Sequence, residues 1–214
     1  MECRIISTGS RGNAVILQDT ILIDCGVSFS RLAALDIKCL RLVLLTHIHS
    51  DHFNRSTLRK LSKERPTLRF ACCSWLVTPL VECGIRYAQI DVIQPNKWYD
   101  YRLCKIKAQE TTHDVKNCCW HICTQAGKAI YATDTGNLNG ITAKGYDLYL
   151  IESNYTQDEI QDRIAEKKAN GEYLYEKRVM KYHLSREAAN DWLVQNMGAA
   201  SQLIYMHQHD CKDN

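Results

Sequence analysis

The chain has 214 residues, of which 45% are hydrophobic and 24% are charged, and its formal net charge is +3. A chain of this length can bury one sizeable core, so we expect a single domain over residues 1–214 rather than two small ones. The mild positive charge does not by itself indicate nucleic-acid binding, and the sequence contains no apolar run near the roughly 18 residues of a membrane span.

The first residues and the cysteines bear on the cellular compartment in which the protein is found. Residues 1–4 lead directly into an apolar strand with no signal-peptide core, so we expect a cytoplasmic protein without membrane contact. The eleven cysteines are odd in number, and several lie in or beside apolar runs. No Cys-x-x-Cys pair occurs. A reduced thiol packs in such runs as a small hydrophobic group, so we predict free cysteines rather than disulfides or a structural zinc site.

The apolar and polar patterns predict short strands with interspersed helices. In chain order, they predict a strand at 4–7, a hairpin of strands at 14–17 and 21–24, a helix at 30–37, a strand at 42–45 and a helix at 55–64. Mostly short strands follow over 68–133, and then come a strand at 147–152, a charge-rich helical segment at 156–181 with a break near 170–171, a helix at 186–196 and a strand at 202–206. Pro66 marks the end of the second helix, and Ser185 is a plausible N-cap for the last one. In the helix at 186–196, Ala189, Trp192 and Leu193 form an inward face.

The densest chemical signal follows the strand at 42–45. The sequence there is Thr46-His47-Ile48-His49-Ser50-Asp51-His52, with three histidines and a carboxylate within six residues. Imidazole and carboxylate ligands suit a divalent cation such as zinc, manganese or iron. So many ligands in one loop fit two adjacent metals better than one. The alternative is a histidine-rich surface loop, but the chain has only eight histidines in all.

Further metal-capable residues follow later strands. His113 comes after the strand-like run 103–109, Asp134 comes after 128–133, and His207 comes after 202–206. His209 could replace His207 in principle, but His207 is preferred because it directly follows the strand. A binuclear metal site needs such ligands from several strand ends.

This combination resembles the metallo-β-lactamase superfamily, whose signature is His-x-His-x-Asp-His followed by separate His, Asp and His ligands. The resemblance covers nearly the whole chain. It implies an α/β fold, a four-layer αβ/βα sandwich, and two divalent metal ions, zinc or alternatively manganese. It also implies a division of ligands in which His47, His49 and His113 hold one metal, Asp51, His52 and His207 hold the second, and Asp134 bridges them.

Five shorter segments narrow the resemblance to the YycJ/WalJ-type branch, whose members are assigned as metal-dependent nucleases related to ribonuclease Z and to cyclic-nucleotide phosphodiesterases. These segments are 9–13, 23–26, 133–136, 151–155 and 182–185. The chain departs from the branch at Phe53-Asn54, where a glycine would follow His52, and in its ending Met206-His207-Gln208-His209. It is also shorter than typical members. These departures leave the metal site intact and the substrate open.

Roles for individual residues follow from this chemistry. Two cations about 3.5 to 4 Å apart polarise a shared water to hydroxide and neutralise charge on the attacked phosphate. Asp51 is a candidate general base, although such a hydroxide makes a separate base less necessary. By resemblance, His183 would donate a proton to the leaving alkoxide or hold the phosphate, and a structural histidine is the alternative. Asp24 would orient a ligand histidine, or else cap a turn.

Four further polar side chains suit hydrogen bonds to phosphate or ribose: Ser10, Asn13, Asn154 and Ser185. As turn and cap residues they have an equally good structural explanation. His121 lies within a predicted strand between Trp120 and Ile122, and we interpret it as structural.

Two classes of function remain. The first is a phosphodiesterase acting on a nucleic-acid strand or a cyclic nucleotide, and the second is a hydrolase of another bond such as a thioester or lactam. A non-catalytic binding module is a weaker third. The charged segment 157–181 is long for a connection and is typical of a lid or a partner contact. Because related phosphodiesterases of this fold are commonly dimers, we also expect a homodimer.

Overall fold

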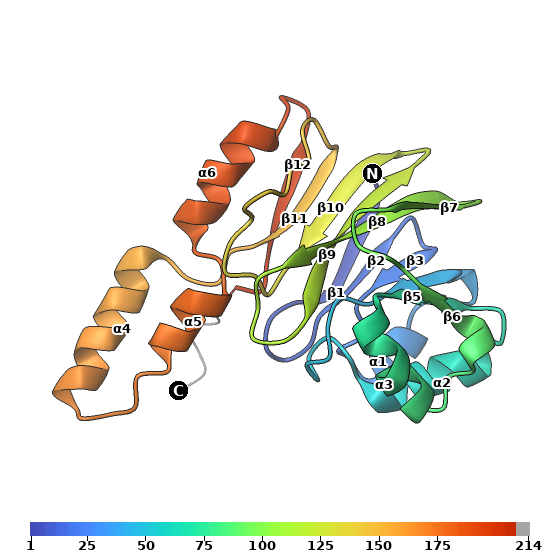
Figure 1. The fold of residues 1–214 in the computed structure, drawn as a ribbon, viewed down its shortest axis with the longest axis horizontal. Helices are drawn as coiled ribbons and strands as arrows, with labels where there is room; N and C mark the ends of the chain where they lie inside the picture. The colour runs from blue at the N-terminus through green and yellow to red at the C-terminus, as the bar shows by residue number, and fades with distance from the viewer. Residues whose placement is uncertain (209–214) are drawn as a thin grey trace.

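Two six-stranded sheets lie face to face in the computed structural model, which describes residues 1–208 (Figure 1). The first sheet has the order β1-β2-β3-β4-β5-β6, with strands at Cys3–Ser7, Ala14–Leu17, Ile21–Ile23, Leu42–Leu44, Arg69–Cys72 and Ile90–Val92. The second has the order β12-β11-β10-β9-β8-β7, with strands, from β7 to β12, at Trp98–Tyr101, Cys104–Thr111, Asn117–Thr124, Gly127–Ala132, Leu148–Glu152 and Gln202–Met206.

Helices form the outer layers. The first sheet is covered by α1 (Phe29–Ala33), α2 (Arg55–Glu64) and α3 (Val77–Glu82), with short 3₁₀ turns at Ile37–Cys39, Ser74–Leu76 and Tyr87–Gln89. The second sheet is covered by α6 (Arg186–Asn196). Two further helices, α4 (Gln157–Ala169) and α5 (Glu176–Tyr182), project from the body of the molecule (Figure 1). The αβ/βα sandwich predicted from the sequence is therefore confirmed.

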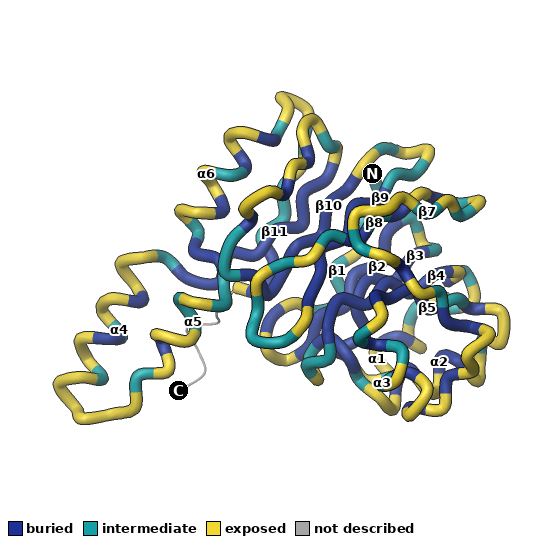
Figure 2. The backbone as a smooth tube through the Cα atoms, in the orientation of Figure 1, coloured by how far each residue is buried: buried dark blue, intermediate teal, exposed yellow. Residues whose placement is uncertain are grey.

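The core forms because consecutive strand residues point to opposite faces of a sheet. Val15 and Leu17 of β2 pack between the two sheets, whereas Ile16 packs against the helices. Both faces of β2, β3 and β4 are covered, so these strands are buried throughout (Figure 2). A buried strand of this kind reads as a continuous apolar run, which is why the sequence predicted these strands well.

The helices at 55–64 and 186–196 have the predicted bounds, with N-caps at Asn54 and Ser185. The helix predicted at 30–37 is shorter, because Asp36 accepts a hydrogen bond from Lys38 and starts a separate 3₁₀ turn. The short helix α3 was not predicted, and its sequence is as apolar as a strand.

Two predictions about the whole chain can be compared with the described residues. The ten cysteines within residues 1–208 are all free, as predicted. Among the helices of the same residues, none is both long and apolar enough to cross a membrane.

Candidate metal centre

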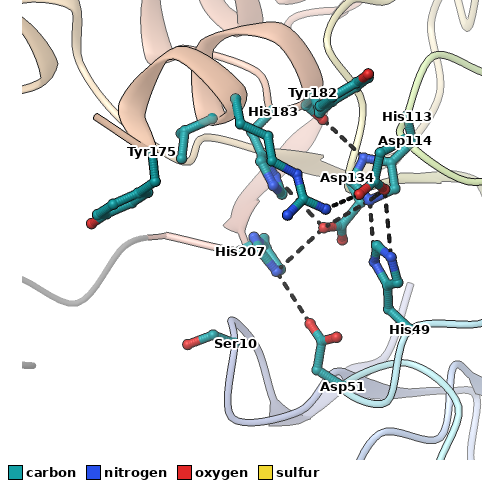
Figure 3. A pocket seen from close by; sticks show the side chains of 12 residues that line it. Ser10, His49, Asp51, His113, Asp114, Asp134, Tyr175, Tyr182, His183 and His207 are labelled. Carbon is teal, nitrogen blue, oxygen red and sulfur yellow. Dashed lines mark hydrogen bonds and ion pairs between the residues drawn. The ribbon is translucent and has the colours of Figure 1, made fainter. Parts of the chain in front are cut away.

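Four loops at one edge of the sandwich carry the residues predicted to bind metal. The loop after β4 carries 47–52, and the loops after β8, β10 and β12 carry His113, Asp134 and His207. Strands β8, β10 and β12 run in one direction within the second sheet, so their carboxyl ends lie at the same edge. Figure 3 shows five of these side chains around a common space: His49, Asp51, His113, Asp134 and His207.

His47, His49 and His113 form the first group of possible ligands, with ligand atoms all within 4.8 Å of one another. Nδ1 of His47 donates to Oγ1 of Thr46 at 2.9 Å, which leaves the lone pair of Nε2 available. That Nε2 is buried and has no hydrogen-bond partner within residues 1–208. Buried polar atoms normally have a partner, and a metal cation would supply it.

The other two histidines of this group face each other. Nδ1 of His113 donates to the carbonyl oxygen of Tyr182 at 3.1 Å, and Nε2 of His113 lies 3.3 Å from Nδ1 of His49. Two ring nitrogens that face each other are stabilised when a cation lies between them. The three histidines therefore fit a divalent metal that accepts nitrogen ligands, such as zinc, manganese or iron.

Asp51, His52 and His207 form the second group, again with ligand atoms within 4.8 Å. Nε2 of His207 lies 3.5 Å from Oδ2 of Asp51 and 3.5 Å from Oδ1 of Asp134. Asp134 also lies 2.8 Å from Nε2 of His52, and it forms a further group of possible ligands with His52 and His47. Its carboxylate thus lies between the two groups, where a bridging ligand would lie.

A buried carboxylate behind the site orients the second group. Nδ1 of His52 donates to Oδ2 of Asp24 at 2.6 Å, which is the contact predicted from the sequence. The backbone N–H and the hydroxyl of Thr46 each donate to Asp24 at 2.9 Å, and the Tyr131 hydroxyl donates to it at 3.1 Å. Asp24 therefore fixes both the start of the histidine-rich loop and the ring of His52, as the outer partners of metal ligands do in metal sites.

The backbone at the site is strained and closely packed. Asp24, Asp134 and His207 have φ values of 54°, 54° and 51°, a region that residues other than glycine rarely adopt and that is enriched at functional sites. A Cβ atom added at Gly136 would lie 2.2 Å from the carbonyl oxygen of Lys181. The end of α5 is thus pressed against the loop that carries Asp134.

The charges at the site favour a bound cation. Burial lowers the pKa of His47 well below its ordinary value, and the nearby His52 lowers it further, so His47 stays neutral. Burial also opposes protonation of His207, but Asp134 and Asp51 raise its pKa to about 9. The carboxylates thus stabilise a positive charge beside the ring nitrogens, and either a proton or a metal cation can supply that charge.

His183 lies beside the second group and is held by a glutamate to which the sequence assigned no role. Nδ1 of His183 lies 2.7 Å from Oε1 of the buried Glu152, whose Oε2 accepts from the backbone N–H groups of Thr135 and Leu184. The His183 ring stacks on that of His207 at 5.3 Å. Burial lowers the pKa of His183, but the Glu152 carboxylate outweighs it and raises the pKa above its ordinary value. The position of Glu152 at the end of β11 was the signal that could have indicated it.

Asp114 and Arg178 complete the rim of the site and were not predicted. Oδ1 of Asp114 lies 3.1 Å from Nε2 of His113 and 3.4 Å from Nε2 of His49. Its other oxygen is paired with the guanidinium of Arg178 in α5. Nothing in the sequence distinguishes Arg178 from the other basic residues of its segment. A cavity of about 310 Å³ opens above these residues and above Ser10, Asp51, Asp134, Tyr175, Tyr182, His183 and His207.

Two of the predicted substrate-binding residues contact ring nitrogens of possible ligands. The side-chain amide nitrogen of Asn13 lies 2.7 Å from Nε2 of His52, and that of Asn154 lies 3.1 Å from Nδ1 of His207. The structure thus brings both asparagines to the metal centre. The alternative ligand His209 lies outside the described residues.

The two predicted serines differ in position. Ser10 lines the cavity. Ser185 is buried, and its hydroxyl accepts from the backbone N–H of Ala188 at 3.2 Å, so it caps α6 as predicted. His121 lies within β9 and packs against Tyr146, apart from the metal centre.

Comparisons with known proteins agree with this architecture. The sequence profile of the beta-lactamase superfamily domain matches residues 19–208 of the chain. No curated protein sequence matches the chain significantly.

Several solved structures have the same fold. The metallo-beta-lactamase fold protein YhfI from Bacillus subtilis superposes with a TM-score of 0.72 at 17% identity, over 97% of this chain and 86% of that chain. The short form of human tRNase Z superposes with a TM-score of 0.66 at 15% identity, over 97% of this chain and 93% of that chain. Zn²⁺-bound PqqB from Methylobacterium extorquens superposes with a TM-score of 0.69 at 11% identity, over 97% of this chain and 89% of that chain. With the profile match over most of its length, the chain belongs to the metallo-β-lactamase superfamily.

Proposed function

We propose that the protein is a phosphodiesterase that uses two divalent cations, zinc or manganese, to hydrolyse a nucleic-acid strand or a cyclic nucleotide. Its superfamily is one of metal-dependent hydrolases, and the histidine and aspartate cluster fits that chemistry. The observation that carries the phosphodiester assignment is the pair His183 and Glu152 beside a complete ligand set. A tRNase Z of the same fold is consistent with a nucleic-acid substrate. The assignment to the YycJ/WalJ-type branch stays a prediction.

The proposal assigns each ligand to a cation. His47, His49 and His113 would hold the first cation, Asp51, His52 and His207 would hold the second, and Asp134 would be a ligand of both. When bound, the cations supply Lewis-acid activation of water and neutralise charge on the phosphate. Asp51 keeps its predicted second role as the acceptor of a proton from the attacking water. Ser10 lies in the cavity, where its hydroxyl would donate to a phosphate oxygen.

His183 acts as the proton donor in this proposal. Because Nδ1 points to Glu152, the other ring nitrogen, Nε2, is the atom that would give its proton to the leaving alkoxide. The buried carboxylate of Glu152 keeps the ring oriented and stabilises its protonated form. Asn13, Asn154 and Ser185 would then act by positioning His52, His207 and the start of α6 rather than by touching the phosphate.

Hydrolysis of a thioester or a lactam is the alternative. A thiolate leaves without needing a proton, so a positioned proton donor favours the ester of an alcohol over a thioester. A hydrolysis panel tests the proposal: single-stranded DNA, RNA, a cyclic mononucleotide, a lactam and a thioester, each with added zinc or manganese. We expect turnover of at least one phosphodiester. Turnover confined to the lactam or the thioester would contradict it.

Three predictions about the whole protein stay predictions: the single domain over residues 1–214, the cytoplasmic location and the homodimer. Light scattering at micromolar concentration measures the mass directly. A clean monomer mass would contradict the homodimer.

A further inference from the structure

The helices α4 and α5 form an arm, residues 157–182, whose face beside the metal centre is aromatic and basic. Tyr175, Arg178 and Tyr182 line the cavity above the metal ligands. A second hollow of about 560 Å³ lies along α5 and is lined by Tyr173, Lys177, Lys181 and Glu172 together with Arg178 and Tyr182. Arg178 and Tyr182 line both hollows, so the two are neighbours on the same side of α5.

Two of the three tyrosines of this face are exposed. The side chain of Tyr173 is 85% exposed and that of Tyr175 is 38% exposed. Large exposed aromatic groups beside a cavity often mark a binding surface. Each tyrosine of the cavity rim also has a cation next to its ring: Nζ of Lys167 lies 3.6 Å from the ring centre of Tyr175, and Nζ of Lys181 lies 4.8 Å from that of Tyr182.

The charge of the face is positive. Lys177 and Lys181 are exposed, and the side chain of Arg178 is 68% exposed although one edge of it is paired with Asp114. The acidic residue of the second hollow is Glu172. Its neighbour Glu176 is buried and paired with Lys167 at 2.8 Å. A guanidinium has five N–H donors, so Arg178 can bind an anion while it is still paired with Asp114.

We propose that this face binds single-stranded nucleic acid that continues outward from the metal centre. The face, called the α5 face below, consists of Tyr173, Tyr175, Lys177, Arg178, Lys181 and Tyr182. Bases would stack on its tyrosines, and backbone phosphates would contact its cations, as in other single-strand binding surfaces. The inference rests on the proposed function, since the scissile phosphate must lie at the metals. A single cyclic nucleotide would fill only the first hollow, so the second hollow indicates a polynucleotide substrate.

Anisotropy of a fluorescent oligonucleotide of about twelve nucleotides tests the charge of the α5 face. Phosphorothioate linkages keep the probe from being hydrolysed by the metal-loaded enzyme, and DNA and RNA versions distinguish the two sugars. We expect Lys177→Glu to weaken binding about 5-fold or more and to reduce the dependence on salt by about one phosphate contact. Lys168→Glu is the matched control, because Lys168 is exposed on the same arm but lines neither hollow.

Substitution of the most exposed tyrosine tests stacking separately. Tyr173→Ala should weaken binding about 5-fold or more, whereas Tyr87→Ala should not, because Tyr87 is 67% exposed but lies in the 3₁₀ turn before β6, away from the arm. Both positions are exposed, so both variants should fold, and circular dichroism checks this. A polyglutamate peptide of equal charge should bind more weakly than the oligonucleotide, because it cannot stack.

Three outcomes would contradict the proposal that the α5 face binds nucleic acid. They are equal losses of affinity for Lys177→Glu and Lys168→Glu, an unchanged affinity for Tyr173→Ala, or polyglutamate binding as tight as that of the oligonucleotide. Hydrolysis of bis(p-nitrophenyl) phosphate by the metal-loaded protein separates the two proposals. If this small diester is hydrolysed but no oligonucleotide is bound, the proposed nucleic-acid binding by the α5 face is wrong, whereas the proposed phosphodiesterase activity is still supported. If it is not hydrolysed although the metals are bound, the proposed function itself fails.

Discussion

Buried histidines occur in two regions of the molecule with opposite surroundings. At the metal centre, His47, His52 and His207 lie at strand ends beside carboxylates. In the second sheet, His121 lies in the middle of β9, where Nδ1 contacts the Tyr146 hydroxyl at 3.2 Å and Nε2 contacts the Cys119 sulfur at 4.0 Å. Neither of these contacts is with a carboxylate, and the nearby cation Lys107 opposes a positive charge on the ring.

The difference teaches that burial alone does not make a histidine a ligand. Burial lowers the pKa of both His47 and His121, since it disfavours the charged form of either ring. The two histidines differ in their neighbours. A ring nitrogen of His47 lies within a few ångströms of Asp134 and of the ring nitrogens of other histidines, whereas His121 belongs to no such group among the described residues. The predictions below change one side of this comparison at a time.

The largest effect should follow from removing a ligand. His47→Ala should abolish hydrolysis, with a loss beyond the roughly 10- to 100-fold typical of changes to outer partners. The fold should persist because the apolar core between the sheets is separate from the site. Elemental analysis of the purified wild type should find about two metals per chain, and the variant should hold fewer. A metal-free protein that cannot be loaded, yet is fully active, would contradict the metal centre.

Removing the proposed proton donor should have the next largest effect. His183→Ala should lower turnover of a nucleotide diester by about 10²- to 10⁴-fold, and that of a nitrophenyl diester much less, because nitrophenolate leaves without a proton. The metal content should not change. Equal losses on both substrates would indicate phosphate positioning instead. A loss of metal would mean that His183 and Glu152 are themselves ligands, since with Asp134 and His207 they could hold an ion.

Removing a carboxylate behind the ligands should have a smaller effect. Asp24→Asn keeps the shape of the side chain but weakens the hydrogen bond from Nδ1 of His52. Metal affinity should fall by roughly 10- to 100-fold, and activity should recover when metal is added in excess. Titration with zinc or manganese followed by an activity assay measures both. An unchanged metal affinity would mean that Asp24 serves only the turn after β3.

The last prediction concerns the stability of the fold, not catalysis, on the other side of the comparison. Burial, with the nearby charge of Lys107, lowers the pKa of His121 to about 4 from an ordinary value of 6.5. The unfolded chain therefore binds the extra proton first as the pH falls. The contribution of His121 to stability should be complete above about pH 6.5, should decrease between there and pH 4, and should then level off after a loss of roughly 3 kcal/mol.

Comparison of the wild type with His121→Gln isolates this contribution. Urea unfolding at a series of pH values should give a free-energy difference between the two proteins that changes across this window, because the metal ligands titrate equally in both. A difference that stays constant from pH 7 to pH 4 would show that His121 does not stay neutral in the folded protein.

Local patterns were enough to predict much of the fold and most of the candidate ligands. Pro66 marks the end of the helix at 55–64, and the N-cap Ser185 and the inward residues Ala189 and Leu193 mark the helix at 186–196, so both signals lie within or beside the segment itself. The ligands follow apolar runs, and strands of one direction end at one edge of a sheet. The same local signals failed for α3 and for the end of α1, where a few residues carry too little periodicity.

The sequence by itself therefore determined which elements form and which residues stand at their ends. Only the tertiary structure decided that Glu152 holds His183, that Arg178 reaches Asp114 from the arm, and that Arg178 and Tyr182 line two neighbouring hollows. The physical reason is that these contacts join residues 31 and 64 positions apart, so their existence depends on how whole elements pack and not on any pattern within one element.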